Sequence, residues 1–146
     1  MTAPIRLSID AMGGDDAPAI VMDGLALFAA RNSEARFLLH GKEDVLRPLL
    51  DANKALAKRC EIAHTDNVVG SGDKPSVALR AGKGSSMWNA VEAVKLGDAN
   101  ACVSAGNTGA LMAMSLVQLR TKQGVKRPAI AASWPQQDGM CVVLDV

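Results

Sequence analysis

Short apolar segments alternate along the chain with stretches of helical periodicity, and this alternation is the strongest constraint on the fold. It predicts strands near residues 5–10, 36–40, 60–63 and 101–104, and helices near 18–32, 45–56, 75–81 and 85–97. Pro48 is expected to limit or kink the second of these helices. Strands separated by helices of this length pair in parallel. The sequence therefore predicts a three-layer α/β fold, a mainly parallel sheet with helices on both faces.

The C-terminal part of the chain follows a different pattern. A helix over residues 111–119 is apolar on nearly every side, which predicts burial between layers. Residues 129–134 and 140–145 form two strands around a short polar turn, so we expect an antiparallel hairpin added to the sheet. Residues 1–146 would then make a single α/β domain. Because the chain stops in or just after a strand, with nothing polar to close it, we expect a fragment of a longer protein, with a natural terminus at this point as the alternative.

Composition excludes several classes of function. With 16 Lys and Arg against 15 Asp and Glu, and only 3% aromatic residues, the chain lacks the features of a nucleic-acid-binding protein. The three cysteines are far apart, which indicates reduced thiols and not a disulfide or zinc framework. No apolar run approaches the roughly 18 residues of a membrane span, and no signal peptide is recognisable. We expect a cytoplasmic protein, with attachment to a membrane surface left open.

The common catalytic signatures are missing from the sequence. There is no nucleotide-binding P-loop, and Gly70-Ser71-Gly72 lacks the third glycine of a dinucleotide site. Neither His40 nor His64 is near a candidate nucleophile, so both are expected to be surface or loop residues. Trp88 and Trp134 are expected to be packing residues, and no metal site is predicted.

Residues 104–109 form the first of three candidate sites. This segment joins a predicted strand to a predicted helix and supplies two glycines, two hydroxyls and an amide. Free N–H groups and the helix dipole favour an anion at such a junction. A tight turn that needs glycine for its backbone geometry explains the segment equally well. The residues of interest are Ser104, Gly106, Asn107, Thr108 and Gly109.

Two further segments carry candidate residues. Lys74, Arg80 and Lys83 concentrate positive charge before a helix start at Ser85 and Ser86, where phosphate could bind; a solvated loop with a routine helix cap is the alternative. Asp10 leaves the first strand and enters a turn that contains Gly13, Gly14 and Asp15. Asp10 or Asp15 could serve in acid–base or metal chemistry, or could simply cap the helix or orient the loop.

Taken together, the three segments resemble one known family. Asp10-Ala-Met-Gly-Gly-Asp15, Lys74-Pro-Ser-Val-Ala-Leu-Arg80 followed by Gly84-Ser-Ser-Met87, and Val103-Ser-Ala-Gly-Asn-Thr-Gly-Ala110 occur in this order and spacing. The chain is similar to the N-terminal part of the bacterial phosphate acyltransferases of phospholipid synthesis. The resemblance runs from about Ile5 to the last residue and covers less than half of such a protein.

This resemblance implies a reaction without a cofactor or metal. Inorganic phosphate would attack the thioester carbonyl of acyl-carrier protein and give acyl phosphate, which needs an anion site, donors for the oxyanion and a groove for the acyl chain. The fold would be similar to those of the phosphotransacetylases and of isocitrate and isopropylmalate dehydrogenases. The helix at 111–119 would line the acyl groove or belong to the ordinary core. In the full-length protein the resemblance also implies a homodimer, peripheral membrane association at the inner face, and transfer of the product to a membrane acyltransferase.

From the motifs and the resemblance together, we predict catalytic roles for Asp10, Lys83 and Asn107. The predicted phosphate- and substrate-binding residues are Gly13, Gly14, Arg80, Ser85, Ser86, Ser104, Gly106, Thr108 and Gly109. Lys74 is left for structure or carrier docking. Two alternatives stay open: a phosphotransacetylase or dehydrogenase relative that uses acetyl-coenzyme A or a nicotinamide, and a non-catalytic phosphate-binding module.

Overall fold

The centre of the molecule is a parallel sheet of four strands. The computed structural model describes residues 4–126 and 128–144. Strands β1 (Arg6–Asp10), β2 (Arg36–Gly41), β3 (Cys60–His64) and β4 (Ala101–Val103) pair in the order β3-β2-β1-β4, and all three pairings are parallel. The predicted parallel α/β architecture is confirmed.

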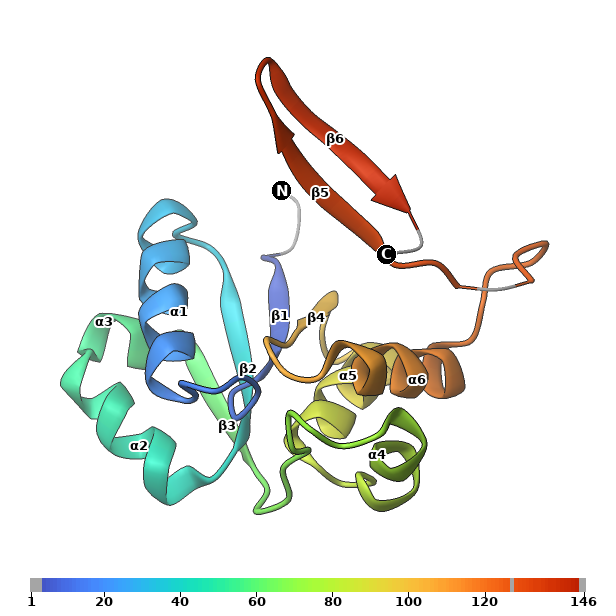
Figure 1. The fold of residues 1–146 in the computed structure, drawn as a ribbon. Coiled ribbons are helices and arrows are strands. Elements are labelled where there is room, and N and C mark those ends of the chain that lie inside the picture. Colours follow the sequence, from blue (N-terminus) through green and yellow to red (C-terminus); the bar gives the residue numbers. More distant parts are fainter. Residues whose placement is uncertain (1–3, 127, 145–146) are drawn as a thin grey trace.

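Helices cover both faces of this sheet (Figure 1). On one side lie α1 (Ala19–Arg31), α2 (Glu43–Ala52) and α3 (Lys54–Ala57), and on the other α4 (Pro75–Ala81), α5 (Ser86–Leu96) and α6 (Thr108–Leu119). Successive strand residues face opposite ways. Accordingly, Phe37 and Leu39 of β2 pack in the core with α1 and α2, whereas Leu38 packs with Ala93 of α5.

Two short helices replace the single helix predicted over residues 45–56. α2 continues through Pro48 and ends at Ala52, and α3 begins after Asn53. The side chain of Asn53 accepts a hydrogen bond from the Leu56 amide at 3.1 Å, which caps α3. The break therefore comes at the capping asparagine and not at the proline.

Helix α6 is less buried than its composition predicts. Ala110, Met114 and Gln118 are buried, and α6 packs on α4 and α5. Its other faces leave Leu116 41% and Val117 52% exposed, because within the described structure only one side of the helix meets other elements. The expectation of a helix buried between layers is wrong.

The C-terminal strands form a hairpin of their own. β5 (Ala131–Gln136) and β6 (Gly139–Leu144) pair antiparallel, as predicted, but form a separate two-stranded sheet (Figure 1). The expectation that the hairpin is added to the central sheet is wrong. Trp134 on β5 is 58% exposed, so it is not the packing residue that was predicted. The predicted end of the last strand, at residue 145, lies outside the described residues.

Candidate active site

The carboxyl ends of β1 and β4 meet because these strands are parallel neighbours. Asp10 ends β1 and is only 2% exposed, and Ser104 directly follows β4. The Ser104 hydroxyl donates a hydrogen bond of 2.7 Å to Asp10 Oδ2 and accepts one of 3.1 Å from the Gly106 amide. Asp10 Oδ1 is buried and has no hydrogen-bond partner among the described residues. Two of the predicted segments are thus joined at one edge of the sheet.

The glycines after β1 allow the two loops to touch. A Cβ on Gly13 would lie 2.4 Å from Asp10 Oδ2 and 2.9 Å from Ser104 Oγ, so no larger residue fits without displacing that hydrogen bond. Gly14 has φ +105°, a conformation that L side chains rarely adopt, and its Cβ position lies 3.2 Å from the Ala105 carbonyl. Backbone therefore packs directly on backbone here.

Asn107 fixes the start of α6. Its Oδ1 accepts a hydrogen bond from the Ala110 amide at 2.9 Å, the usual bond of a helix N-cap. Its Nδ2 donates to the carbonyls of Ser71 at 3.0 Å and Asp73 at 2.8 Å. The side-chain amide therefore holds the 71–73 loop against the helix start. A catalytic role for Asn107 stays a prediction beside this structural one.

A cavity of about 430 Å³ opens at the N-terminus of α6. It is lined by Gly14, Asp15, Ser71 and residues 105–109, and Asp15 is the one titratable residue among these described residues. The amides of Asn107, Thr108 and Gly109 lie at the first positions of the helix, before its internal bonds begin. Across residues 4–126 and 128–144 no acceptor takes these three N–H groups. The arrangement is suited to an anion.

The basic segment lies outside this cavity. Lys74, Arg80 and Lys83 are exposed, and none of them lines it. Arg80 bonds back to the Ser76 carbonyl within α4 at 3.2 Å. The segment still approaches the α6 start from one side, because a Cβ on Gly109 would lie 2.7 Å from the ring of Pro75. Phosphate-binding roles for Arg80 and Lys83 stay predictions.

Ser85 and Ser86 are both buried at the start of α5. Ser85 Oγ accepts a hydrogen bond from the Trp88 amide at 3.2 Å, which caps the helix. The Ser86 amide donates to the Asn67 carbonyl at 2.9 Å, while its hydroxyl oxygen has no partner within the described part of the chain. The following Met87 packs behind Gly106. The two serines therefore fix the start of the helix that carries Met87.

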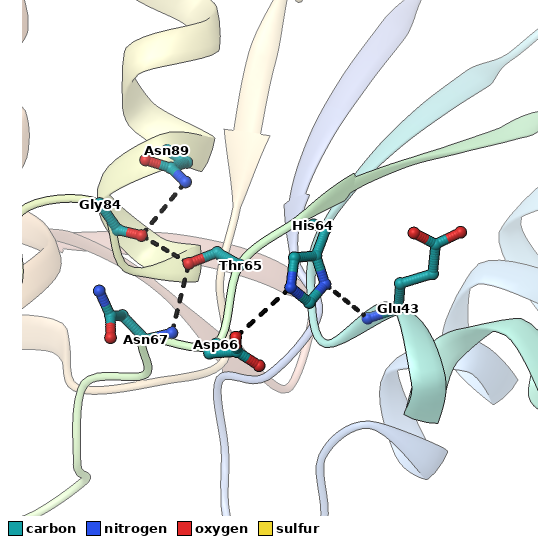
Figure 2. A network of polar contacts seen from close by, with 7 residues as sticks. All are labelled: Glu43, His64, Thr65, Asp66, Asn67, Gly84 and Asn89. Carbon is teal, nitrogen blue, oxygen red and sulfur yellow. Dashed lines mark hydrogen bonds and ion pairs between the residues drawn. The ribbon is translucent and has the colours of Figure 1, made fainter.

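A polar network after β3 holds the turn before α5, and no sequence motif predicts it (Figure 2). Thr65 Oγ1 donates to the Gly84 carbonyl at 2.6 Å and accepts from the Asn67 amide at 3.3 Å. Asn89 donates to the same Gly84 carbonyl at 3.3 Å. Because Gly84 follows Lys83 directly, this network sets where the Lys83 backbone lies. The bond from Thr65 to Gly84 joins residues 19 positions apart, so no local motif marks it.

The two histidines differ in environment. His64 is half exposed, as expected, and its Nδ1 accepts from the Glu43 amide (Figure 2). His40 contradicts the expectation of a surface residue: it lies in β2, is 4% exposed, and its Nε2 is 2.9 Å from Ser8 Oγ. Burial, with a smaller effect of Arg6, lowers the pKa of His40 to about 4. Its neutral ring is part of the sheet and not of the cavity.

The cysteines are free thiols, as predicted. Burial raises the pKa of Cys60 to about 11. Burial also raises the pKa of Cys102, and the Asp10 carboxylate adds to that shift. Both are therefore protonated and weakly nucleophilic at neutral pH. No group of three His, Cys, Asp or Glu side chains arranged to hold a metal ion occurs within the described residues.

Comparison with known proteins identifies the family. The sequence model of a family described as fatty acid synthesis protein matches residues 5–146. The chain belongs to this fatty acid synthesis family. It is 55% identical over 147 residues to a phosphate acyltransferase of Azorhizobium caulinodans, with 100% of this chain and 41% of the relative covered. Phosphate acyltransferases of Maricaulis maris and Mesorhizobium japonicum are 53% and 55% identical, covering 100% and 97% of this chain and 42% and 40% of theirs.

The chain spans about two fifths of the length of these relatives. The resemblance found in the sequence motifs is therefore confirmed at the level of the family. No helix in the described structure has the length and apolar character needed to cross a membrane.

Proposed function

We propose that this chain carries the phosphate-binding part of a phosphate acyltransferase, which transfers an acyl group from the thioester of acyl-carrier protein to inorganic phosphate. The observation that carries the proposal is the cavity of free main-chain amides at the start of α6, beside the Asp10–Ser104 hydrogen bond. Membership of the fatty acid synthesis family and relatives named phosphate acyltransferase support the same reaction.

In the proposed reaction, a phosphate oxygen attacks the thioester carbonyl carbon. The new C–O bond forms as the C–S bond breaks, and the sulfur leaves as a thiolate that takes up a proton. The N–H groups of Thr108 and Gly109 hold phosphate oxygens without adding a side chain that would have to be ordered. Asp15, which lines the cavity, accepts a hydrogen bond from the hydroxyl group of a hydrogenphosphate ion, and the proton of that group is the one that the leaving thiolate takes up. The reaction uses no covalent enzyme intermediate and no cofactor.

The proposed partners follow from the substrates. An acidic carrier protein would meet the exposed cations Lys74, Arg80 and Lys83, which lie on the segment next to the cavity. Attraction of this kind is screened over about 8 Å at physiological salt, so docking should weaken as salt is added. We further propose that the complete protein is a cytoplasmic homodimer. It would associate with the membrane surface and pass acyl phosphate to a membrane acyltransferase.

A proline at residue 108 tests the amide cavity directly. Thr108 is the first residue of α6, where proline is tolerated, and Asn107 before it has an extended backbone (φ −61°, ψ 110°) that a following proline accepts. Thr108→Pro removes one N–H donor while keeping the helix. We expect phosphate binding, measured by calorimetric titration, to weaken about tenfold or more, because a hydrogen bond to a charged group contributes about 1.5–3 kcal/mol.

Thr108→Ala is the matched control, because it removes the hydroxyl and keeps the amide. The control should bind phosphate within about twofold of the wild-type chain if the main chain supplies the contact. Equal binding by Thr108→Pro and the wild-type chain would refute the proposed site. The corresponding substitution in a full-length relative should lower the rate of acyl phosphate formation from acyl-carrier protein.

A further inference from the structure

A basic hollow of about 300 Å³ lies at the amino ends of the first three strands. Arg6 and Arg36 are the first residues of β1 and β2, and Lys58 and Arg59 come directly before β3. All four cations line the hollow, and Glu61 is the one carboxylate among its described lining residues. Because the strands are parallel, their carboxyl ends, and with them the amide cavity, lie at the opposite edge of the sheet.

Most of the positive charge in this hollow is not neutralised. Arg6 forms an ion pair with Glu61. No described carboxylate forms an ion pair with Arg36, Lys58 or Arg59. Arg6 and Arg36 are also direct partners in the register of β1 and β2, so their side chains leave the sheet on the same face. Like charges placed opposite each other destabilise a sheet, and an anion bound between them would remove that cost.

Arg59 is held in a fixed position at the hollow. Its guanidinium donates to the carbonyls of Ala35 at 2.9 Å and Ala29 at 2.8 Å, and to that of Asn32. The centroid of the Phe37 ring lies 5.6 Å from its central carbon. These bonds use three of the five N–H groups of an arginine, which leaves two for a ligand. A cation fixed in advance loses little conformational freedom when a ligand binds.

We propose that this hollow binds a small molecule with two or more linked phosphate groups. Arg36, Lys58 and Arg59, which lack a described carboxylate partner, match the several negative charges that such a molecule carries near neutral pH. Small-molecule sites span about 300–1,000 Å³, so the hollow is large enough for more than a single phosphate ion. Arginine and lysine are the side chains that proteins use to bind phosphate groups. The site is separate from the cavity at the start of α6 and does not depend on the proposed acyl transfer.

Calorimetric titration of the 146-residue chain with pyrophosphate tests the site. Arg36→Gln and Lys58→Gln are combined in one double variant, because both side chains are exposed. This variant should bind pyrophosphate about tenfold or more weakly, since two charged contacts are lost. Lys122→Gln combined with Lys126→Gln is the matched control, because it removes two positive charges at exposed positions outside the hollow. The control should bind within about twofold of the wild-type chain.

Two further titrations identify the source of the phosphate groups and separate this site from the α6 cavity. Equal affinity for ADP and pyrophosphate would assign recognition to the phosphate groups alone, and tighter binding of ADP would assign a nucleotide. The loss caused by the double variant should persist when Thr108→Pro is added, because that substitution affects only the α6 cavity. No binding of pyrophosphate by the wild-type chain, or equal binding by the wild-type chain and the double variant, would overturn the proposal. Either result leaves the response of inorganic phosphate to Thr108→Pro, and so the proposed function, unaffected.

Thermal unfolding distinguishes a lost ligand contact from a lost fold. Without ligand, the double variant should unfold at a temperature no lower than that of the wild-type chain, because removing like charges relieves their repulsion. Pyrophosphate should raise the unfolding temperature of the wild-type chain and not that of the double variant. An equal rise in both would place the bound pyrophosphate elsewhere and refute the site.

Discussion

His40 shows how a single buried side chain makes the stability of this protein depend on pH. Its pKa is about 4 in the folded chain against an ordinary value of 6.5, so between these values the unfolded chain binds the extra proton. The stabilisation that comes from the neutral His40 ring is therefore present above pH 6.5 and is lost as the pH falls toward 4. Between pH 7 and pH 5 the loss amounts to about 2 kcal/mol. Urea unfolding at both values should show this loss in the wild-type chain but not in His40→Gln, once the pH dependence common to both has been subtracted.

For single residues, the sequence indicates which side chains are of interest but not which other residues they contact in the fold. The motifs singled out Asp10, Gly13 and Ser104, which the structure brings together, because glycines and carboxylates at strand ends are locally recognisable; their roles stay predictions. Burial of His40 could not be predicted, because it depends on the helix that covers β2 and not on the residues beside it in the chain. The dual bonding of Asn107 likewise depends on a loop more than thirty residues away.

Among the elements, α1 depends on a side chain from the turn before β3. Arg59 donates through Nε to the Ala35 carbonyl at 2.9 Å and through its Nη atoms to the carbonyls of Ala29 and Asn32, at the end of α1. Lysine has the charge but not the fork of donors that reaches all three carbonyls. We expect Arg59→Lys to lower the free energy of unfolding by about 2 kcal/mol. Arg31→Lys, on an exposed position of the same helix, should change it by less than about 0.5 kcal/mol.

The order of helices and strands was predictable because hydrophobic periodicity is a local property. β1, β2 and β3 lie within about two residues of their predicted ranges. The errors occur where a neighbour decides the outcome: the partnerless faces of α6, and the hairpin that pairs with itself and not with the sheet. Both segments have the composition of buried structure, and composition alone does not say what covers them.

For the whole molecule, stability should reside in the central sheet and its helices. Leu39 in β2 is fully buried, so Leu39→Ala should cost about 2–5 kcal/mol of unfolding free energy. Val142 in β6 is 67% exposed, and Val142→Ala should change it by less than about 0.5 kcal/mol. Denaturant titration compares the two directly. A large effect at Val142 would mean that the hairpin packs on the rest of the protein in solution.

The site itself depends on an arrangement that local patterns do not encode. Asp10 and Ser104 are 94 residues apart, and only the pairing of β1 with β4 brings them together. The sequence contains three segments that each could bind phosphate or substrate. The order of the strands places the segments after β1 and β4 side by side, and the cations of the third segment lie outside the cavity.

The free peptide N–H groups of Asn107, Thr108 and Gly109 have a practical consequence for mutagenesis. An alanine scan replaces side chains and keeps every peptide N–H, so scanning residues 105–109 would report the structural role of Asn107 and the tight packing of Gly106 and Gly109 but would leave the anion donors in place. Replacing single amides by esters through chemical synthesis deletes one donor at a time and would reveal what a conventional scan overlooks. A ligand designed for this cavity would gain its affinity from main-chain N–H groups, which most single substitutions leave in place.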